Sequence, residues 1–171
     1  MTFSLAVART IEREGGFTND PLDPGGATRY GITLTTLSLW KRKPASVEDV
    51  KKLSVNEAVR IYKALWWDAM GLDALPPKIA AVVFDAGVLF GQQTAAAALQ
   101  KTLVNLGASL EVDGHIGPKT ANAAGLVSPK LFFPAYVGTL LDRINAIIER
   151  RPTSQKYRKG WERRVKEYPV I

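Results

Sequence analysis

Apolar residues recur at helical spacing near the start of the chain, and the pattern stops at a pair of glycines. Phe3, Val7 and Ile11 are each four positions apart, which puts their side chains on one face of a helix. Gly15-Gly16 follows directly, and glycine ends helices at little conformational cost. We therefore expect a first helix that ends at Glu14.

The next segment, residues 15–31, has the sequence GGFTNDPLDPGGATRYG, with five glycines and two prolines. This density of turn-forming residues predicts a loop or a short hairpin rather than a long regular element. Loops of this length within a compact domain are uncommon and are usually functional. The segment is therefore the first place to look for a site.

Helical periodicity returns after this loop. Residues 33–41 predict a short second helix, and Ser46 and Ser54 each precede an acid by three positions, which is the spacing of a capping box. The helix after Ser54 is amphipathic and is expected to run to about Met70, where Gly71 ends it. Its apolar face consists of Ala58, Ile61, Tyr62, Leu65 and Trp66.

The second half of the chain also has a helical pattern. Pro76-Pro77 opens a largely apolar helix over residues 78–90, and residues 92–106 continue as a helix that Gly107 ends. Asp113-Gly114 is a turn signal. Two short helical pieces are expected beyond it, at residues 120–124 and, rich in basic side chains, at residues 155–168.

A longer amphipathic helix is expected after Ser128-Pro129, an N-cap followed by proline at the first helical position. Pro134 lies inside this helix and is expected to kink it or to delay its start. The sequence has no internal repeat or flexible linker, so we expect a mainly α fold with a packed domain boundary near residues 90–107. The apolar face consists of Phe132, Tyr136, Leu140, Ile144 and Ile147.

The composition excludes several kinds of catalytic site. The 171 residues are 46% apolar and 23% charged, which is ordinary for a folded globular protein. The chain has no cysteine, so disulfides, thiolate nucleophiles and cysteine-ligated metals are excluded. A single histidine, His115, cannot form a multi-histidine metal site. Carboxylates are therefore the expected catalytic groups, with no metal and no organic cofactor.

The net charge of +7 predicts a polyanionic partner, which is nucleic acid, acidic lipid or a bacterial wall. Near the end of the chain, Tyr157, Trp161 and Tyr168 lie among basic residues. A nucleic-acid-binding helix has a similar mixture, although no nucleic-acid-binding motif frames this one. Charge alone leaves the three partners open. The basic residues are Arg150, Arg151, Lys156, Arg158, Lys159, Arg163, Arg164 and Lys166.

Two features of the sequence concern membranes and export. The first residues, MTFSLAVARTIEREGG, have no basic region ahead of an apolar stretch, so no signal peptide is predicted. The longest apolar stretch, residues 79–90, is broken by Asp85 and is too short to cross a bilayer. We expect synthesis in the cytoplasm and no transmembrane segment.

Candidate catalytic chemistry centres on Glu14 and the loop after it. Many glycosidases use a carboxylic acid to protonate the leaving oxygen, while a second carboxylate or a held water acts on the other face of the sugar. At a helix C-terminus, the negative end of the helix dipole disfavours an ionised carboxylate, as a general acid requires. Asp20, Asp23 and Thr28 follow on a loop that can fold back over this helix end. Alternatively, the glycines only build turns and the acids are ordinary solvated side chains.

The same loop carries a resemblance to a known family. The residues concerned are Glu14-Gly15-Gly16-Phe17, Asn19, Pro21, Asp23, Gly25-Gly26, Thr28 and Gly31-Ile32-Thr33. In this order they resemble the signature of glycoside hydrolase family 108, the N-acetylmuramidases of phage endolysins and of bacterial secretion systems. The order of Glu, Asp and Thr is also similar to the catalytic trio of phage-type lysozymes, although Asp23 and Thr28 are one residue closer together here.

The resemblance implies roles for particular residues. Glu14 corresponds to the catalytic acid, and Asp23 and Thr28 correspond to groups that position water or substrate. Asp20 and Tyr30 are candidate substrate-binding residues, with Tyr30 either stacking on a sugar or packing in the fold.

The resemblance continues along most of the chain. Tyr62 and Trp66-Trp67-Asp68 match aromatic positions of the family whose expected role is core packing. Leu89 stands where the family usually has asparagine, so a substrate contact at that place is in doubt. Residues 112–120, with the sequence VDGHIGPKT, resemble a peptidoglycan-binding-type module, in which His115 is expected to be an exposed turn residue.

These resemblances imply a lysozyme-like helical fold, with a catalytic region at 1–90 and a peptidoglycan-binding-type helical module at 91–171 packed against it. They imply a bacteriolytic, endolysin-like hydrolase that cleaves the β-1,4 bond between N-acetylmuramic acid and N-acetylglucosamine in bacterial peptidoglycan. We expect a monomer, released from the host cytoplasm to act on the wall, with no stable nucleic-acid partner. The alternatives are a basic nucleic-acid-binding helical protein and a peptidoglycan binder without hydrolytic activity.

Overall fold

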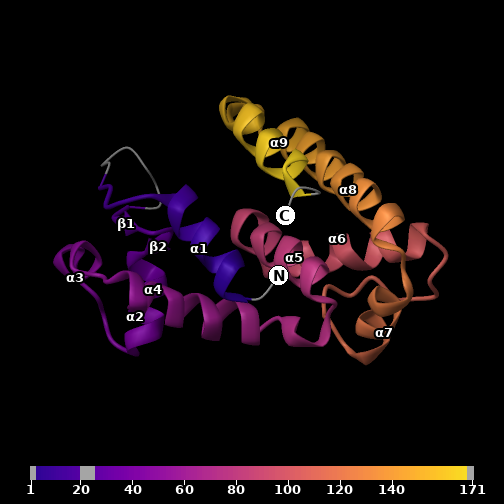
Figure 1. The fold of residues 1–171 in the computed structure, drawn as a ribbon. Helices are drawn as coiled ribbons and strands as arrows, with labels where there is room; N and C mark the ends of the chain where they lie inside the picture. The colour runs from indigo at the N-terminus through magenta and orange to yellow at the C-terminus, as the bar shows by residue number, and fades with distance from the viewer. Residues whose placement is uncertain (1–2, 20–25, 169–171) are drawn as a thin grey trace. The chain divides into compact units, whose positions relative to one another are not determined.

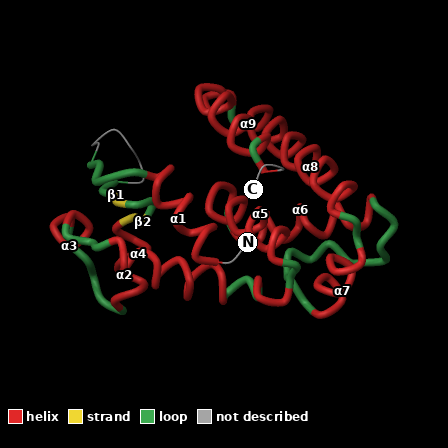
Figure 2. The backbone as a smooth tube through the Cα atoms, in the orientation of Figure 1, coloured by secondary structure: helices red, strands yellow, loops and turns green. Residues whose placement is uncertain are grey.

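The structure is a computed structural model that describes residues 3–19 and 26–168 (Figure 1). Figure 2 shows that most of this part of the chain is helical and that its two strands form one short hairpin. The chain divides into two compact units, Thr2–Leu65 and Trp66–Ile171. The mainly α fold predicted from the sequence is confirmed.

The first unit begins with the predicted helix, which ends at Glu14 as expected. The glycine-rich segment after it returns as an antiparallel hairpin, in which Thr28 pairs with Thr33 and Arg29 with Ile32. Three short helices follow the hairpin and enclose a core that includes Ile32 and Leu37, both fully buried. The elements are α1 (Phe3–Glu14), β1 (Thr28–Arg29), β2 (Ile32–Thr33), α2 (Leu34–Lys41), α3 (Val47–Lys51) and α4 (Val55–Tyr62).

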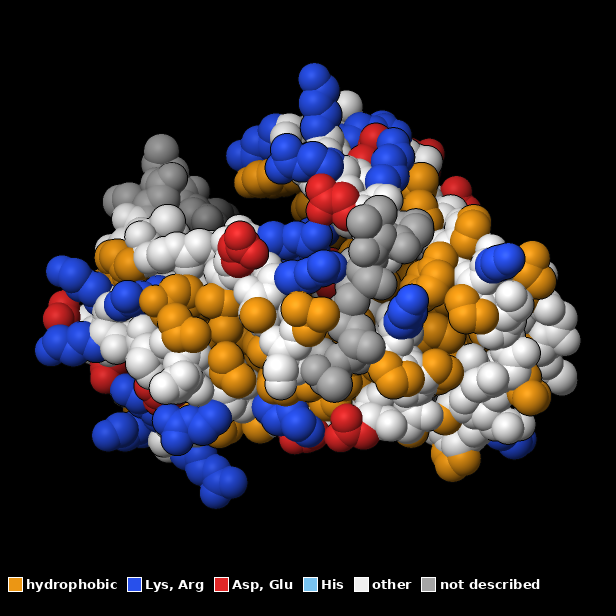
Figure 3. Space-filling model, in the orientation of Figure 1, with side chains coloured by type: hydrophobic (Ala, Val, Ile, Leu, Met, Phe, Trp, Pro, Cys, Tyr) orange, Lys and Arg blue, Asp and Glu red, His pale blue; other side chains and the backbone are white. Residues whose placement is uncertain are grey.

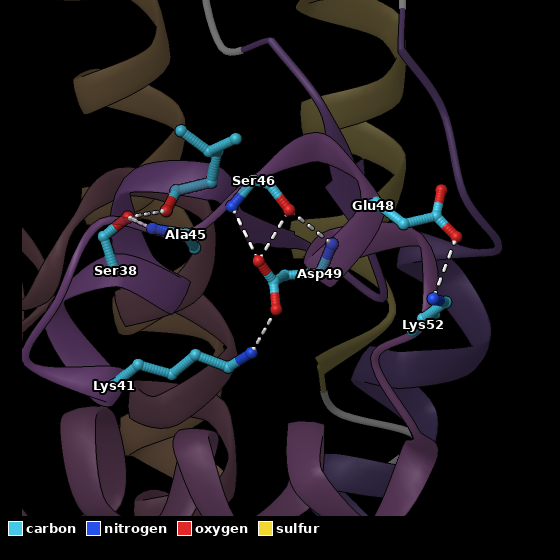
Figure 4. A network of polar contacts seen from close by, with 8 residues as sticks. Ser38, Lys41, Ala45, Ser46, Glu48, Asp49 and Lys52 are labelled. Carbon is cyan, nitrogen blue, oxygen red and sulfur yellow. Dashed lines mark hydrogen bonds and ion pairs between the residues drawn. The ribbon is translucent and has the colours of Figure 1, made fainter.

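A capping network joins α2 to α3 (Figure 4). The Ser46 Oγ accepts a 3.1 Å hydrogen bond from the Asp49 N–H, and the Ser46 N–H donates to Asp49 Oδ2 at 2.8 Å, which completes the predicted capping box. Lys41 Nζ lies 2.7 Å from Asp49 Oδ1. The hydrogen bond from Lys41, followed by those from Ser46, holds the pKa of Asp49 well below its ordinary value.

The helix after Ser54 differs from its prediction. Ser54 caps it as expected, but α4 ends at Tyr62, and a π-helix, η1 (Lys63–Asp68), takes its place up to the turn at Gly71. The wider π-helical turn changes the direction in which the side chains point. Trp67 is buried there, and its Nε1 donates a 2.6 Å hydrogen bond to Asp73 Oδ1.

The second unit is built around the apolar helix α5, in which nine consecutive residues, Ile79 to Gly87, are buried. Pro77 is its first residue, as the Pro76-Pro77 pair predicts. Helix α6 packs on α5, and α8 packs on α6 and α9. The elements are η2 (Leu72–Ala74), α5 (Pro77–Phe90), α6 (Gln92–Asn105), α7 (Pro118–Leu126), α8 (Pro129–Arg150), η3 (Pro152–Tyr157) and α9 (Arg158–Lys166).

Helix α8 starts at Pro129 and continues through Pro134, so its start is not delayed. Pro134 lies near the N-terminal end of α8, where few backbone hydrogen bonds of the helix precede it. The predicted apolar face is largely buried, at Phe132, Tyr136, Leu140 and Ile144. By length and composition this helix would be able to cross a membrane, which is weak evidence because core helices meet the same criteria.

The C-terminal tail is fastened to α5 by an ion pair. Instead of one helix over residues 155–168, the tail forms the 3₁₀-helix η3 followed by α9. Arg164 of α9 donates two hydrogen bonds to Asp85 of α5, from Nε at 2.9 Å and from Nη2 at 3.0 Å. Both side chains are largely buried, with exposed fractions of 13% and 6%. The parallel, two-pronged geometry is the one that guanidinium and carboxylate groups prefer.

Candidate active site

Glu14 lies at the point where the first helix ends and the chain reverses. It is the last residue of α1 and is half-buried. Gly15 follows with φ of +74°, a conformation that favours glycine, and its N–H donates a 3.1 Å hydrogen bond to the carbonyl of Ile11. The glycine therefore turns the chain away immediately after the carboxylate.

Backbone hydrogen bonds join the residues after α1 to the hairpin. Thr18 and Thr28 exchange two backbone hydrogen bonds, of 2.8 and 2.9 Å, which close the base of the loop. The N–H of Tyr30 donates a 3.0 Å hydrogen bond to the carbonyl of Gly15. These bonds bring the hairpin against the helix end that carries Glu14, as the sequence predicts for a loop able to fold back.

The turn of the hairpin consists of Tyr30 and Gly31, which both have positive φ, of 54° and 75°. Positive φ at both central residues is characteristic of a type I′ turn. Gly31 has a second reason to be glycine, because a Cβ there would collide with the Tyr62 hydroxyl and lie 2.9 Å from Glu14 Cγ. The hairpin turn, Glu14 and Tyr62 are therefore in close contact.

Tyr62 holds this turn through a hydrogen bond from its buried side chain. Its side chain is fully buried, and its hydroxyl donates a 2.9 Å hydrogen bond to the carbonyl of Tyr30. Tyr62 is the last residue of α4, and α4 packs on α1. The same helix pair thus positions both the carboxylate of Glu14 and the turn beside it.

Arg29 supports the hairpin from its other side. Its guanidinium lies over the Tyr30 ring, 5.0 Å from the ring centroid, and its Nη2 is 3.2 Å from the Tyr30 hydroxyl. Its Nη1 donates to the carbonyl of Lys51, the last residue of α3. Tyr30 is therefore held by its backbone and by its ring.

Three of the predicted site residues, Glu14, Thr28 and Tyr30, belong to this arrangement. Asp20 and Asp23 lie outside the described residues. The sequence analysis missed the contributions of Arg29 and Gly31 and assigned Tyr62 only a packing role. The signal available for Gly31 was its place after Tyr30 at the end of a glycine-rich segment.

The turn around Asp113-Gly114 in the second unit is organised by the buried side chain of Gln100. Gln100 Nε2 donates hydrogen bonds to Asp113 Oδ1 at 2.7 Å and to the carbonyl of His115 at 2.8 Å, while its Oε1 accepts one from the Gly114 N–H at 2.8 Å. His115 is exposed in this turn, as expected. The module-like motif therefore has a structural role, which is to fix this turn on α6.

The remaining charged side chains form no candidate metal site among the described residues, but the basic ones gather on one surface (Figure 3). Within residues 3–19 and 26–168, no three His, Cys, Asp or Glu side chains are grouped so that they could hold a metal ion. Lysine and arginine side chains gather over α9 and the neighbouring part of α8 (Figure 3). Lys159, Arg163 and Lys166 of α9 are exposed, as is Lys156 of the preceding η3.

Comparisons with known proteins agree with this picture. The sequence matches the family model "Glycosyl hydrolase 108" over residues 7–91 and the family model "Predicted Peptidoglycan domain" over residues 94–166. A search of curated proteins gave no match. The solved structure of SagA from Brucella abortus has a TM-score of 0.83 and 31% sequence identity to the chain, over 98% of this chain and 91% of that one.

The likeness to SagA extends over nearly the whole of both chains, and the first family match includes Glu14 and the hairpin. The predicted mainly α, lysozyme-like fold is confirmed. The second family match makes peptidoglycan the substrate class. The chain therefore belongs to the glycosyl hydrolase 108 family and is a peptidoglycan hydrolase.

Proposed function

We propose that the protein is an N-acetylmuramidase that cleaves the β-1,4 bond between N-acetylmuramic acid and N-acetylglucosamine, with Glu14 as the general acid. The observation that carries this proposal is the contact between the Glu14 side chain and the Gly31 turn at the end of α1. A carboxylic acid held against a fixed turn has few orientations available, which suits directed proton transfer.

In this mechanism Glu14 donates its proton to the glycosidic oxygen while the bond from that oxygen to C1 of N-acetylmuramic acid breaks. The N-acetylglucosamine part leaves as an alcohol, and positive charge develops at C1 in an oxocarbenium-like transition state. Water adds to C1 and loses a proton, which leaves a hydroxyl at the new reducing end. Protonation of the Glu14 carboxylate from solvent restores the acid.

Thr28 and Asp23 are proposed to position the water or the sugar, and Tyr30 and Asp20 are proposed to contact the substrate. Thr28 suits its role because backbone hydrogen bonds with Thr18 fix its position. The ring of Tyr30, held by Arg29, presents an aromatic surface suited to sugar stacking.

Substitution of Glu14 by glutamine tests the general acid, since glutamine keeps the shape and removes the proton. We expect Glu14→Gln to reduce the hydrolysis of purified peptidoglycan by about 10²–10⁴-fold without a change in melting temperature. Glu12→Gln is a matched control, because Glu12 is exposed on the same helix. Near wild-type turnover by Glu14→Gln would rule out Glu14 as the general acid.

Mass spectrometry of digested peptidoglycan tests which bond is cut. A muramidase yields fragments with N-acetylmuramic acid at the reducing end, whereas cleavage of the other β-1,4 bond yields N-acetylglucosamine there. A lytic transglycosylase yields an anhydro product instead. Either of the last two results would contradict the proposed reaction.

Thr28 and Asp23 are tested by Thr28→Ala and Asp23→Asn, for which partial losses of activity are expected. Thr18→Ala is the control for Thr28, because the two residues form the same backbone bridge and only the Thr28 hydroxyl is given a role. Full activity in both Thr28→Ala and Asp23→Asn would show that the analogy with the lysozyme trio is wrong.

We also propose an endolysin-like route, in which the enzyme is made in the cytoplasm and reaches the wall through a separate component such as a holin pore. The resemblance of the loop after Glu14 to that of phage endolysins is the basis of this proposal. Expression in bacteria with and without a membrane-permeabilising protein tests it. Rapid lysis without that protein would contradict it.

A further inference from the structure

A groove of about 460 Å³ lies on the second unit, where α6 and α8 meet the Asp113-Gly114 turn. Its lining includes the small side chains of Ala97 and Ala146. Side chains of both signs also line it, with Lys101 and Arg143 as cations and Asp113 and Asp142 as acids. The groove therefore combines small apolar side chains with charges of both signs.

Arg143 has unsatisfied hydrogen-bonding capacity in this groove. It is half-buried, and its Nε is enclosed and has no hydrogen-bond partner among the described residues. Because Nε is enclosed, a ligand in the groove meets Arg143 at the other end of the guanidinium, whose N–H groups can donate paired hydrogen bonds to a carboxylate. The groove thus contains a site that suits a carboxylate of a bound molecule.

The walls of the groove are fixed before anything binds. The Thr102 hydroxyl of α6 is 3.0 Å from the Thr139 hydroxyl of α8, which joins the two helices beneath the groove. Gln100 holds the Asp113 side chain and the Gly114 N–H. The hydrogen bond from Gln100, followed by that from the His115 N–H, lowers the pKa of Asp113, so this acid is ionised near neutral pH.

The lining of the groove also limits which ligands fit. Two carboxylates would repel a polyanion such as a teichoic acid or a nucleic acid. The described lining has no aromatic ring, the group on which sugars usually stack. A short peptide with small side chains, carboxylates and a free amine matches both the charges and the small apolar floor.

We propose that this groove binds the stem peptide of peptidoglycan, with Arg143 taking a peptide carboxylate and Asp142 facing a peptide amine. This inference rests on the proposed peptidoglycan substrate but assigns a place and a chemical class that are separate from the glycosidic bond. Peptide recognition by the second unit would direct the enzyme to strands that carry peptides.

The test is a titration of the full chain with free stem tetrapeptide, L-alanyl-γ-D-glutamyl-meso-diaminopimelyl-D-alanine, followed by NMR. We expect shift changes in α6 and α8 for the wild type and a loss of affinity of about tenfold in Arg143→Gln. Arg150→Gln, an exposed arginine on the same helix, is expected to bind as the wild type does. Asp142→Asn is expected to weaken binding of the native peptide. It is not expected to weaken binding of a peptide whose side-chain amine is acetylated.

Equal binding by the wild type and by a folded Arg143→Gln variant would overturn the proposal, as would the absence of shift changes at about 10 mM peptide. If Arg143→Gln does not fold, the peptide affinities of Lys101→Gln and Asp142→Asn are compared with that of the wild type instead, and equal affinities would overturn the proposal. Binding of poly(glycerol phosphate) in the groove would also overturn it, since the occupant would then be a polyanion. The peptide has no glycosidic bond, so these outcomes are independent of whether Glu14 is the catalytic acid.

Discussion

The buried hydroxyl of Tyr62 donates a 2.9 Å hydrogen bond to the backbone carbonyl of Tyr30, at the turn of the hairpin that lies against Glu14. A turn with two positive φ angles is costly for a non-glycine residue such as Tyr30, so surrounding contacts must hold it. This hydrogen bond connects the end of α4 to the turn. The Tyr62 hydroxyl therefore serves, in our proposal, to position the candidate active site without touching the substrate.

Removal of this hydroxyl provides the first test. Tyr62→Phe keeps the ring in the core and removes only the donor, so we expect a loss of about 1 kcal/mol in the free energy of unfolding. Peptidoglycan hydrolysis at a temperature where the variant is folded is expected to fall as well, since the turn beside Glu14 is less restrained. Tyr157→Phe, at an exposed tyrosine, is the control. Unchanged stability and activity in Tyr62→Phe would show that the bond does not position the turn.

Gly31 provides a second test with a matched control. Gly31→Ala adds the cost of positive φ for alanine, about 1–2 kcal/mol, to a collision with Tyr62 and with Glu14 Cγ. Gly26 also has positive φ, 65°, but no atom of the described residues lies within 4 Å of the position of a Cβ there, so Gly26→Ala is expected to carry mainly the conformational cost. We expect Gly31→Ala to be the less stable and the less active of the two, as measured by denaturant unfolding and by lysis. Equal losses of stability and activity in the two variants would show that the space beside Tyr62 and Glu14 can accommodate a Cβ at position 31.

Local signals in the sequence predicted the ends of elements well. Gly15 ends α1 after Glu14, and Ser46 caps α3 with Asp49, because such signals act between residues within about four positions of each other. The contacts within the candidate active site were not predictable in this way. Tyr62 and Tyr30 are separated by 32 positions, and no periodicity encodes which core tyrosine places its hydroxyl under a turn.

The π-helix η1 was also not predictable from the local sequence pattern. Over six residues, the apolar pattern of a π-helix differs little from that of an α-helix, so the sequence predicted one continuous α-helix to Met70. The burial of Trp67 and its hydrogen bond to Asp73 depend on tertiary packing. In the second unit, the motif at residues 112–120 was found from the sequence, but its cause, the buried Gln100 amide, was visible only in the fold.

Asp49 gives a prediction about pH. Its pKa is lowered in the folded state by the hydrogen bond from Lys41 and by those from Ser46, whereas an unfolded aspartate titrates near pH 3.9. The stability that the carboxylate contributes is therefore present above about pH 4 and is lost as the pH falls below that value. We expect Asp49→Asn to lower the melting temperature at pH 7 and to have a smaller effect at about pH 3. An effect of the same size at both pH values would mean that the charge of Asp49 is not the stabilising feature.

The basic surface over α9 gives a prediction about salt. Lys159 and Arg163 are exposed, and neither forms an ion pair with another described residue. Replacement of both by glutamate is expected to weaken binding to purified cell walls at low salt. The difference is expected to vanish at about 1 M salt, where the Debye length is about 3 Å. The swap of Lys159→Arg with Arg163→Lys keeps the charge and is the control. Tight binding of the wild type to duplex DNA at physiological salt would favour the nucleic-acid alternative.

The ion pair of Asp85 and Arg164 gives the last prediction, which separates a structural role from a catalytic one. Both groups are largely buried, so Asp85→Asn removes a buried negative charge beside the Arg164 guanidinium and is expected to cost about 3–5 kcal/mol in unfolding free energy. Replacement of both, Asp85→Leu with Arg164→Met, removes the buried charges together and is expected to recover most of this loss. Glu149→Gln, at an exposed acid on α8, is expected to have no effect.

Activity measured per folded molecule completes this comparison. A carboxylate such as that of Asp85 is also a candidate catalytic group, but Asp85 accepts hydrogen bonds from Nε and Nη2 of Arg164 in the C-terminal helix. If the pair only fastens α9 to α5, the double variant hydrolyses peptidoglycan at the wild-type rate where both proteins are folded. A stable double variant that lacks activity would place Asp85 in the reaction, because its packing would have been restored while its carboxylate was absent.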